Sequence, residues 1–234
     1  MANNLQSFTP EEQIRRAFDR EQIKNVFAKH CYCHLALRHD LEMEKIWAHN
    51  APNVSWGFPT GFQVGRDTVW DFYVKPNLAK AAAPSVCRMH TLTTPLIEIA
   101  GDGQTAQGMW YTPGFGPIER ENYDPRDGQP LQGEWIYEHY AVDFIRENGQ
   151  WMIWHMFVAG DFNFEAGTRY EEPELDCGNQ EIKWTAPSVL SVPRLTTAKW
   201  GWSRFPHWPE PYETWTPEIG YGADKFMEMA GEAR

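Results

Sequence analysis

The sequence predicts an α+β fold: a cone-shaped, curved antiparallel sheet wrapped round a long N-terminal helix, with an irregular C-terminal arm. Three observations predict it: helical segments near the N-terminus, strand-like segments in the middle of the chain, and a long hairpin pattern at 134–161. The order helix, helix, strand, helix and four antiparallel strands is typical of a bent sheet that curls round a helix and leaves a cone-shaped cavity. We expect the barrel to span residues 9–164 and the arm to span residues 165–234.

The hairpin has the clearest local pattern in the chain. Two runs of aromatic and β-branched residues are joined by Glu147-Asn148-Gly149-Gln150. The Asn-Gly pair accepts the positive φ angles that a type I′ turn requires. Neither face of the hairpin is polar, so we expect both faces to be covered.

Two helix starts precede it. Thr9-Pro10-Glu11-Glu12 is a capping box with proline at the first helical position, and it starts a short helix. Asp19-Arg20-Glu21-Gln22 starts a second helix with one mainly apolar face. That face carries Ile23, Val26, Phe27, His30, Cys31, His34 and Leu37. The opposite side of its back half is also apolar or aromatic, so this helix is expected inside the molecule.

Shorter elements connect these helices to the hairpin. Asp40 is expected to cap a helix over 41–49, and a strand is expected over 53–58. A helix over 68–74 is expected to end or kink at Pro76. Further strands are predicted over 88–99 and 105–111, with a turn at 101–103. Residues 113–133 form a loop of the length that lids and binding segments use.

The region after residue 165 is rich in proline and tryptophan and has no sustained period. Its aromatic content argues against disorder. We therefore expect an ordered arm that packs on the barrel or on a neighbouring subunit.

Composition excludes several classes of protein. The formal net charge of −11 argues against non-specific nucleic-acid binding and against anionic membrane surfaces. No apolar run is long enough to span a bilayer and no signal peptide is recognisable, so we expect a cytoplasmic protein with free thiols. Aromatic residues make up 15% of the chain, including 12 Trp, which indicates a pocket for flat ligands or extensive buried interfaces. The motifs of serine hydrolases, kinases and nicotinamide enzymes are absent from the sequence.

Three motifs resemble those of SnoaL-like proteins in the nuclear-transport-factor-2-like superfamily. Residues 32–42, YCHLALRHDLE, resemble the first-helix motif; residues 88–95, RMHTLTTP, resemble the strand that carries a histidine; residues 140–155 resemble the closing hairpin with its Gly-x-Trp. The resemblance covers about residues 17–163. It implies a cone-shaped barrel, a homodimer or homotrimer, and chemistry without a cofactor.

Members of that superfamily include scytalone dehydratase, bile acid dehydratase, ketosteroid isomerase, polyketide cyclases and a lignin-derived diarylpropane lyase that releases formaldehyde. The size of the chain, its Trp-rich composition and its expected aromatic pocket favour the last group. The fold also hosts binding proteins without activity.

His90 and Tyr32 are the predicted catalytic residues. His90 matches the catalytic histidine of the dehydratase members, and an imidazole titrates near neutral pH and can serve as a base. Tyr32 matches a helix tyrosine that donates a hydrogen bond to the substrate oxygen. The alternatives are a core histidine bonded to a hydroxyl and a tyrosine that only packs. Leu37 departs from the family, because many members carry there an aspartate that orients the histidine. Three alternatives follow. His90 acts without a carboxylate partner, another acid such as Glu138 or Asp143 replaces the aspartate, or the reaction is different.

Further residues are predicted to contact the substrate through stacking, charge or hydrogen bonds. They are His34, Arg38, Trp56, Phe58, Arg88, Trp110, Glu138 and His155. His30 and His34 have the i, i+4 spacing of a zinc-binding pair, but no third ligand is identifiable, so we predict no metal site.

We therefore predict a cofactor-independent lyase that acts by acid–base catalysis on a hydrophobic, hydroxylated aromatic small molecule. Deformylation or dehydration of a lignin-derived diarylpropane diol is the specific expectation. The alternatives are a steroid or polyketide isomerase or cyclase, and a non-catalytic small-molecule-binding protein.

Overall fold

The fold begins with two helices, and the rest of the chain forms strands with a second group of short helices among them. The computed structural model describes residues 8–58, 61–81, 87–117, 124–128, 130–167, 186–187 and 207–224. The helical elements are α1 (Pro10–Leu35), α2 (His39–Lys45), α3 (Arg66–Val69), a π-helical turn (Trp70–Val74), α4 (Lys75–Lys80) and a 3-10 turn (Pro125–Asp127). The strands are β1 (Ser55–Phe58), β2 (Gly61–Val64), β3 (Met89–His90), β4 (Thr93–Ile99), β5 (Thr105–Pro117), β6 (Gly133–Glu147), β7 (Gln150–Glu165) and β8 (Ala186–Pro187).

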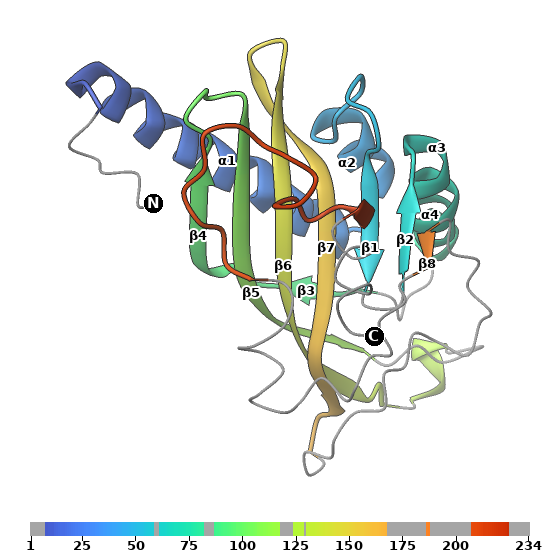
Figure 1. The fold of residues 1–234 in the computed structure, drawn as a ribbon. Coiled ribbons are helices and arrows are strands. Elements are labelled where there is room, and N and C mark those ends of the chain that lie inside the picture. Colours follow the sequence, from blue (N-terminus) through green and yellow to red (C-terminus); the bar gives the residue numbers. More distant parts are fainter. Residues whose placement is uncertain are drawn as a thin grey trace, which may run out of the picture.

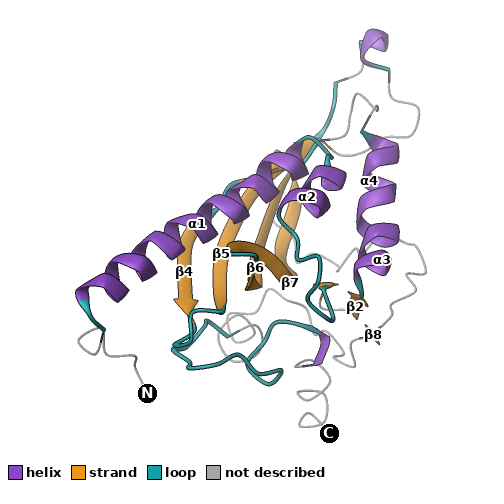
Figure 2. Ribbon diagram, turned by 90° about the horizontal axis from the view of Figure 1, so that it is seen from above, coloured by secondary structure: helices purple, strands orange, loops and turns teal. Residues whose placement is uncertain are grey.

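The strands form one curved sheet in the order β3-β5-β6-β7-β1-β2-β8, with β4 also paired to β5. The predicted α+β class is confirmed, but the sheet is mixed rather than purely antiparallel, because β1 runs parallel to β7. Helix α1 crosses one face of the sheet and residues 207–224 cross the other (Figure 1). The view from above separates the same two layers (Figure 2). We call the face against α1 the inner face and the other the outer face.

Helix α1 is one continuous helix, where the sequence predicts two. The capping box at Thr9 is present as expected. Asp19, the predicted second start, is instead buried inside the helix and accepts hydrogen bonds from Arg146 (2.7 Å) and Trp151 (3.0 Å). Asp19 therefore does not cap a helix; its carboxylate anchors α1 to the sheet. Phe27, further along the same face, packs on Trp110 with ring centroids 4.4 Å apart.

Other boundaries also differ from the prediction. Helix α2 begins at His39 and not at 41. Asp40 pairs with Arg38 and does not cap the helix. Pro76 lies in the first turn of α4, directly after the π-helical turn, so the helical segment continues past it. Strand β2 was not predicted. The strand expected over 88–99 divides into β3 and β4, and β5 extends to Pro117, into the expected loop. Loop residues 118–123 and 129 lie outside the described residues.

The central hairpin is confirmed, with Asn148 and Gly149 at φ 51° and 78° in its turn. One irregularity changes which side chains face inward. Asp143 pairs with His155 while Phe144 pairs with Ile153, so Trp154 is an extra residue in β7. Such a bulge reverses the alternation of side chains along a strand. Ile153 packs in the inner core, whereas His155 faces outward.

The outer face is covered by the described part of the C-terminal arm. The amide of Gly101 donates to the carbonyl of Tyr212 (2.9 Å), and the amide of Tyr221 donates to Asp143 (2.6 Å). Arm residues 168–185, 188–206 and 225–234 lie outside the described part of the chain. Among the described residues, no helix is long and apolar enough to cross a membrane.

Candidate functional site

A tight turn between α1 and α2 brings a carboxylate back to the first helix. Leu37 adopts φ 53° and lets the chain reverse immediately after α1. The amide of Arg38 donates to the carbonyl of Cys33 (2.8 Å), which closes the turn. As a result Glu42 of α2 lies against His30, twelve residues earlier in the chain.

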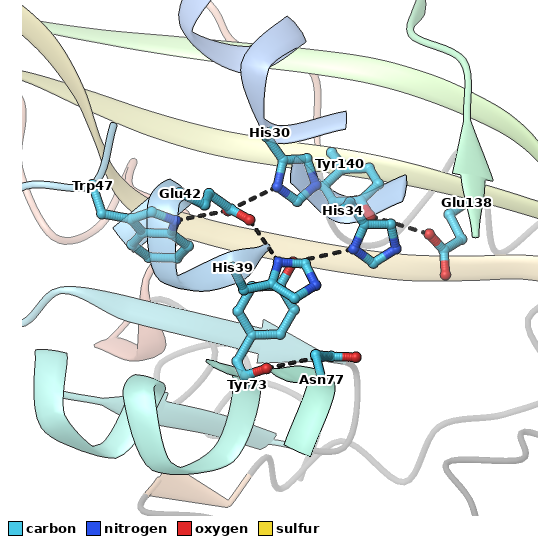
Figure 3. A network of polar contacts seen from close by, with 9 residues as sticks. All are labelled: His30, His34, His39, Glu42, Trp47, Tyr73, Asn77, Glu138 and Tyr140. Atoms are coloured by element: carbon cyan, nitrogen blue, oxygen red, sulfur yellow. Dashed lines mark hydrogen bonds and ion pairs between the residues drawn. The ribbon is translucent and has the colours of Figure 1, made fainter. Parts of the chain in front are cut away.

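Glu42 is completely buried and accepts three hydrogen bonds (Figure 3). Nδ1 of His30 lies 2.8 Å from Oε1, Nδ1 of His39 lies 2.7 Å from Oε2, and the indole N–H of Trp47 donates to Oε1 at 2.8 Å. Burial raises the pKa of Glu42, but the charges and hydrogen bonds of His30 and His39 outweigh burial and lower it to about 2. Glu42 is therefore ionised at neutral pH.

Two further imidazoles extend this network towards the strands. The ring of His34 lies 5.5 Å from His30, 5.0 Å from His39 and 4.8 Å from His90, measured between centroids. His90 comes from β3, and its Nδ1 lies 3.5 Å from Oε2 of Glu138 on β6. We call His30, His34, His39 and His90 the histidine cluster.

Two phenols border the histidine cluster. The hydroxyl of Tyr73, from the π-helical turn, lies 3.4 Å from Nδ1 of His34. The amide of Asn77 donates to the Tyr73 carbonyl at 2.6 Å and ties this turn to α4. The hydroxyl of Tyr140 on β6 donates to Glu138 at 3.3 Å (Figure 3).

The protonation states of these groups follow from burial. Burial lowers the pKa of His90, against the opposing charge of Glu138. Burial, followed by the neighbouring imidazoles, lowers the pKa of His34 well below its usual range. Burial and nearby carboxylates raise the pKa of Tyr73 and Tyr140 well above theirs. At neutral pH His34 and His90 are therefore neutral imidazoles, which accept protons, and Tyr73 and Tyr140 are neutral phenols, which donate hydrogen bonds.

Three imidazole nitrogens of the cluster are buried and have no hydrogen-bond partner within the described ranges: Nε2 of His30, Nε2 of His39 and Nδ1 of His90. Most buried polar atoms in native proteins are paired, so such a group requires an explanation. Three of them within one cluster are typical of a site that holds a polar ligand.

An aromatic wall adjoins the phenol of Tyr73. The ring of Trp56 on β1 stacks with Tyr73 at 5.4 Å between centroids and makes a tilted contact with Phe58 at 5.1 Å. Phe72 completes the group at 5.3 Å from Trp56. The predicted substrate contacts His34, Trp56 and Phe58 thus lie in or beside the cluster, and Glu138 lies beside His90.

The structure corrects the placement of Tyr32. Its side chain is 77% exposed, on the side of α1 that faces away from the sheet. The helical face of Ile23, Phe27 and His30 is the buried one, and Tyr32 lies two positions past His30, outside it. The phenols near the imidazoles are Tyr73 and Tyr140 instead.

Four other predicted contacts lie away from the histidine cluster. His155 is on the outer face because of the bulge at Trp154, and it pairs with Asp143. Trp110 is 2% exposed and packs in the core against Phe27. Arg38 pairs with Asp40, and Arg88 lies 4.0 Å from Glu134; both arginine side chains are more than 40% exposed.

Sequence reasoning missed the roles of His39, Glu42, Tyr73 and Tyr140. His39 and Glu42 are three apart on one helix, a spacing that places side chains together and could have indicated the contact. The approach of Tyr73 and Tyr140 depends on tertiary packing and has no local pattern.

Within the described part of the chain, no three His, Cys, Asp or Glu side chains have a geometry that could hold a metal ion. In the histidine cluster, Nδ1 of both His30 and His39 is already engaged by Glu42.

Comparison with known proteins places these elements in a family context. The family profile described as SnoaL-like domain matches residues 15–156, which include most of α1 and most of the central hairpin. A sequence comparison with curated proteins gives no significant match.

Several solved structures share the fold at low sequence identity. A hexachlorocyclohexane dehydrochlorinase from Novosphingobium barchaimii has 15% identity and a TM-score of 0.51, over 69% of this chain and 99% of that one. A candidate scytalone dehydratase from Novosphingobium aromaticivorans has 13% identity and a TM-score of 0.50, over 71% and 97%. A candidate dehydratase from Streptomyces avermitilis has 15% identity and a TM-score of 0.50, over 62% and 97%.

Proposed function

The chain belongs to the SnoaL-like family, and we propose that it is a cofactor-independent lyase acting by acid–base catalysis on a hydroxylated aromatic small molecule. The observation that carries the proposal is the buried Nδ1 of His90. It has no hydrogen-bond partner among the described residues and faces Glu138 at 3.5 Å. A neutral imidazole beside a carboxylate is a base that can take a proton and return it.

The neighbouring side chains fit such a substrate. The phenols of Tyr73 and Tyr140 stay neutral because burial raises their pKa values, so they can donate hydrogen bonds to a substrate oxygen. Trp56 and Phe58 supply flat apolar surface beside Tyr73 for an aromatic ring. The names of the fold relatives, a dehydrochlorinase and candidate dehydratases, support an elimination in general.

We propose as the specific reaction the deformylation of a diarylpropane diol with a para-hydroxyl group. A base removes the phenolic proton, and the benzylic hydroxyl takes up a proton and leaves as water, which gives a quinone methide. Removal of the proton from the terminal hydroxyl then cleaves the adjacent carbon–carbon bond and releases formaldehyde. The electron pair of the cleaved bond forms the double bond of the stilbene product and restores the phenolate, which takes back a proton from the protonated base. Since the para-hydroxyl drives the first step, one orienting carboxylate at Leu37 is not needed.

His90→Gln tests the proposal. Turnover of a 1,2-diarylpropane-1,3-diol is followed by formaldehyde release and by the absorbance of the stilbene. Because the variant keeps the size of the side chain but loses the base, we expect kcat/KM to fall by about 10²–10⁴-fold with the fold retained. His49→Gln is the matched control, since His49 is exposed, and it should retain full activity.

Other outcomes separate the alternatives. Unchanged turnover in His90→Gln would remove the role of His90. Tight binding of the diol by the wild type without any product would favour a binding protein. A shifted double bond in a steroid, without loss of any group, would favour an isomerase.

A further inference from the structure

We infer that Glu42 is a positioning residue that makes Nε2 the proton-exchanging atom of both His30 and His39, and that these two Nε2 atoms hold hydroxyl groups of the substrate. This inference rests on the proposed function for the identity of the ligand. The role of Glu42 itself rests only on the geometry of the site.

The first step concerns hydrogen placement. An ionised carboxylate carries no proton, so all three of its neighbours must donate to it. The indole of Trp47 is a donor only, and Nδ1 of His30 and Nδ1 of His39 lie 2.8 and 2.7 Å from Glu42. Both imidazoles therefore keep a proton on Nδ1, whether the ring is neutral or cationic. Any proton gained or lost by either ring is exchanged at Nε2.

The second step concerns what the two Nε2 atoms do. Both rings are at most 1% exposed, and neither Nε2 has a hydrogen-bond partner among the described residues. Leaving a buried nitrogen unpaired is unfavourable, so a structural role alone would be served better by apolar side chains at both positions. Nε2 accepts a hydrogen bond where the ring is neutral and donates one where it is cationic, and a hydroxyl group can be the partner of either form.

The third step concerns location. His34 lies between the two rings and His90, with centroid separations of 4.8 to 5.5 Å. A diol or phenol held by His30 and His39 would thus lie next to the proposed base. Glu42 takes the orienting role that the family assigns to the aspartate position at Leu37, but it acts on different histidines.

Glu42→Gln tests the positioning role without any substrate. A carboxamide has one acceptor oxygen and one donor nitrogen, so it can accept from only one of the two imidazoles. Long-range proton–nitrogen NMR spectra of the full-length protein with 15N-labelled histidine report which ring nitrogen carries hydrogen. We expect Nδ1–H on both His30 and His39 in the wild type, and a switch to Nε2–H on one of them in the variant. Glu44→Gln, exposed on the same helix, should change neither.

The wild-type spectrum alone can overturn this role if Glu42→Gln fails to fold. An Nδ1 without hydrogen on either ring of the wild type, or two unchanged rings in a folded Glu42→Gln, would contradict the inference. Where the variant folds, we also expect kcat/KM for the diol to fall by about 10–100-fold, while Glu44→Gln retains it.

Titration with 4-hydroxybenzyl alcohol tests the ligand part. We expect the Nε2 resonances of His30 and His39 to shift on binding, and unchanged resonances at saturation would overturn this part. Failure of the two proposals can be told apart. A protein with the expected hydrogens on both rings but no turnover of the diol contradicts the proposed function alone. A protein that turns over the diol with no hydrogen on Nδ1 of these rings contradicts this inference alone.

Discussion

The two faces of the sheet each hold a buried carboxylate bonded to a histidine. On the inner face Glu42 lies 2.8 Å from Nδ1 of His30, and on the outer face Asp143 lies 2.8 Å from Nδ1 of His155. Both carboxylates are completely buried. The local geometry of the two pairs is therefore nearly the same.

Their surroundings differ. Asp143 also accepts from the side chain of Gln107 (2.9 Å) and from the backbone amide of Tyr221 (2.6 Å). The imidazole of His155 stacks on the indole of Trp154, which also packs against the indole of Trp215. The outer pair thus joins the arm to the sheet. The inner pair adjoins the three other imidazoles of the histidine cluster and two phenols, and imidazole nitrogens there have no partner among the described residues.

This contrast teaches that a carboxylate–histidine pair does not identify a catalytic site. Buried atoms without a partner among the described residues lie beside both pairs, but they differ in kind. Beside the inner pair they are imidazole nitrogens, which can exchange protons, whereas beside His155 they are the hydroxyl of Ser55 and the indole nitrogen of Trp215. We therefore expect the outer pair to contribute to stability and the histidine cluster to contribute to activity.

Asp143→Ala should break this comparison most directly. It leaves His155, Gln107 and the Tyr221 amide without their shared partner, and removing one member of a buried pair costs about 3–5 kcal/mol. We expect urea unfolding to show that loss, and hydrogen exchange of the Tyr221 amide to become faster. Activity per folded molecule should persist under conditions where the variant is folded.

Asp71→Ala is the control for that variant. Asp71 forms an exposed ion pair with Lys75, and such pairs contribute little. A stability of Asp143→Ala equal to that of this control would contradict the anchoring role of the outer pair.

Because of the histidine cluster and Glu42, the stability of the folded protein should fall in two steps as the pH is lowered. Because burial lowers the pKa values of His34 and His90, the unfolded chain binds protons that the folded protein does not, and stability falls as pH drops below about 6.5. Glu42 titrates at about 2 when folded, so its contribution is present above its ordinary pKa of 4.5 and is lost from there towards pH 2. Each unit of that difference corresponds to about 1.4 kcal/mol.

Urea midpoints measured from pH 7 to pH 3 check this prediction. Glu42→Gln should remove the lower step and keep the upper one. A wild-type midpoint that stays constant between pH 7 and pH 5 would contradict the assignment of neutral, buried imidazoles.

Local patterns predicted much of the fold. The Asn148-Gly149 turn and the capping box at Thr9 are encoded in a few adjacent residues, and both are present. The bulge at Trp154 is not encoded in this way: strict alternation places His155 with Ile153, and the extra residue in β7 moves it to the opposite face. Register irregularities depend on how two strands pair, so a single strand does not reveal them.

The same distinction holds for the site. His90 and His34 were identified from sequence, and they lie 4.8 Å apart. Glu42 could be found only once the turn at Leu37 was known to bring α2 back against α1. Tyr32 shows the opposite error, because a family motif placed it in the site while helical geometry places it on the surface.

The smallest expected effect on activity comes from removing a single phenol hydroxyl, from either Tyr73 or Tyr32. Tyr73→Phe removes a buried hydroxyl that lies 3.4 Å from His34, so we expect kcat/KM to fall by about tenfold, the value of one net hydrogen bond in the transition state. Tyr32→Phe removes the same atom from a side chain that is 77% exposed, and we expect no change in activity. The free energy of unfolding of both variants should lie within about 1 kcal/mol of the wild-type value. Steady-state kinetics on the diol decide between them: loss of activity in Tyr32→Phe with full activity in Tyr73→Phe would restore the assignment made from the motif and would show that the relevant phenol lies outside the inner cluster.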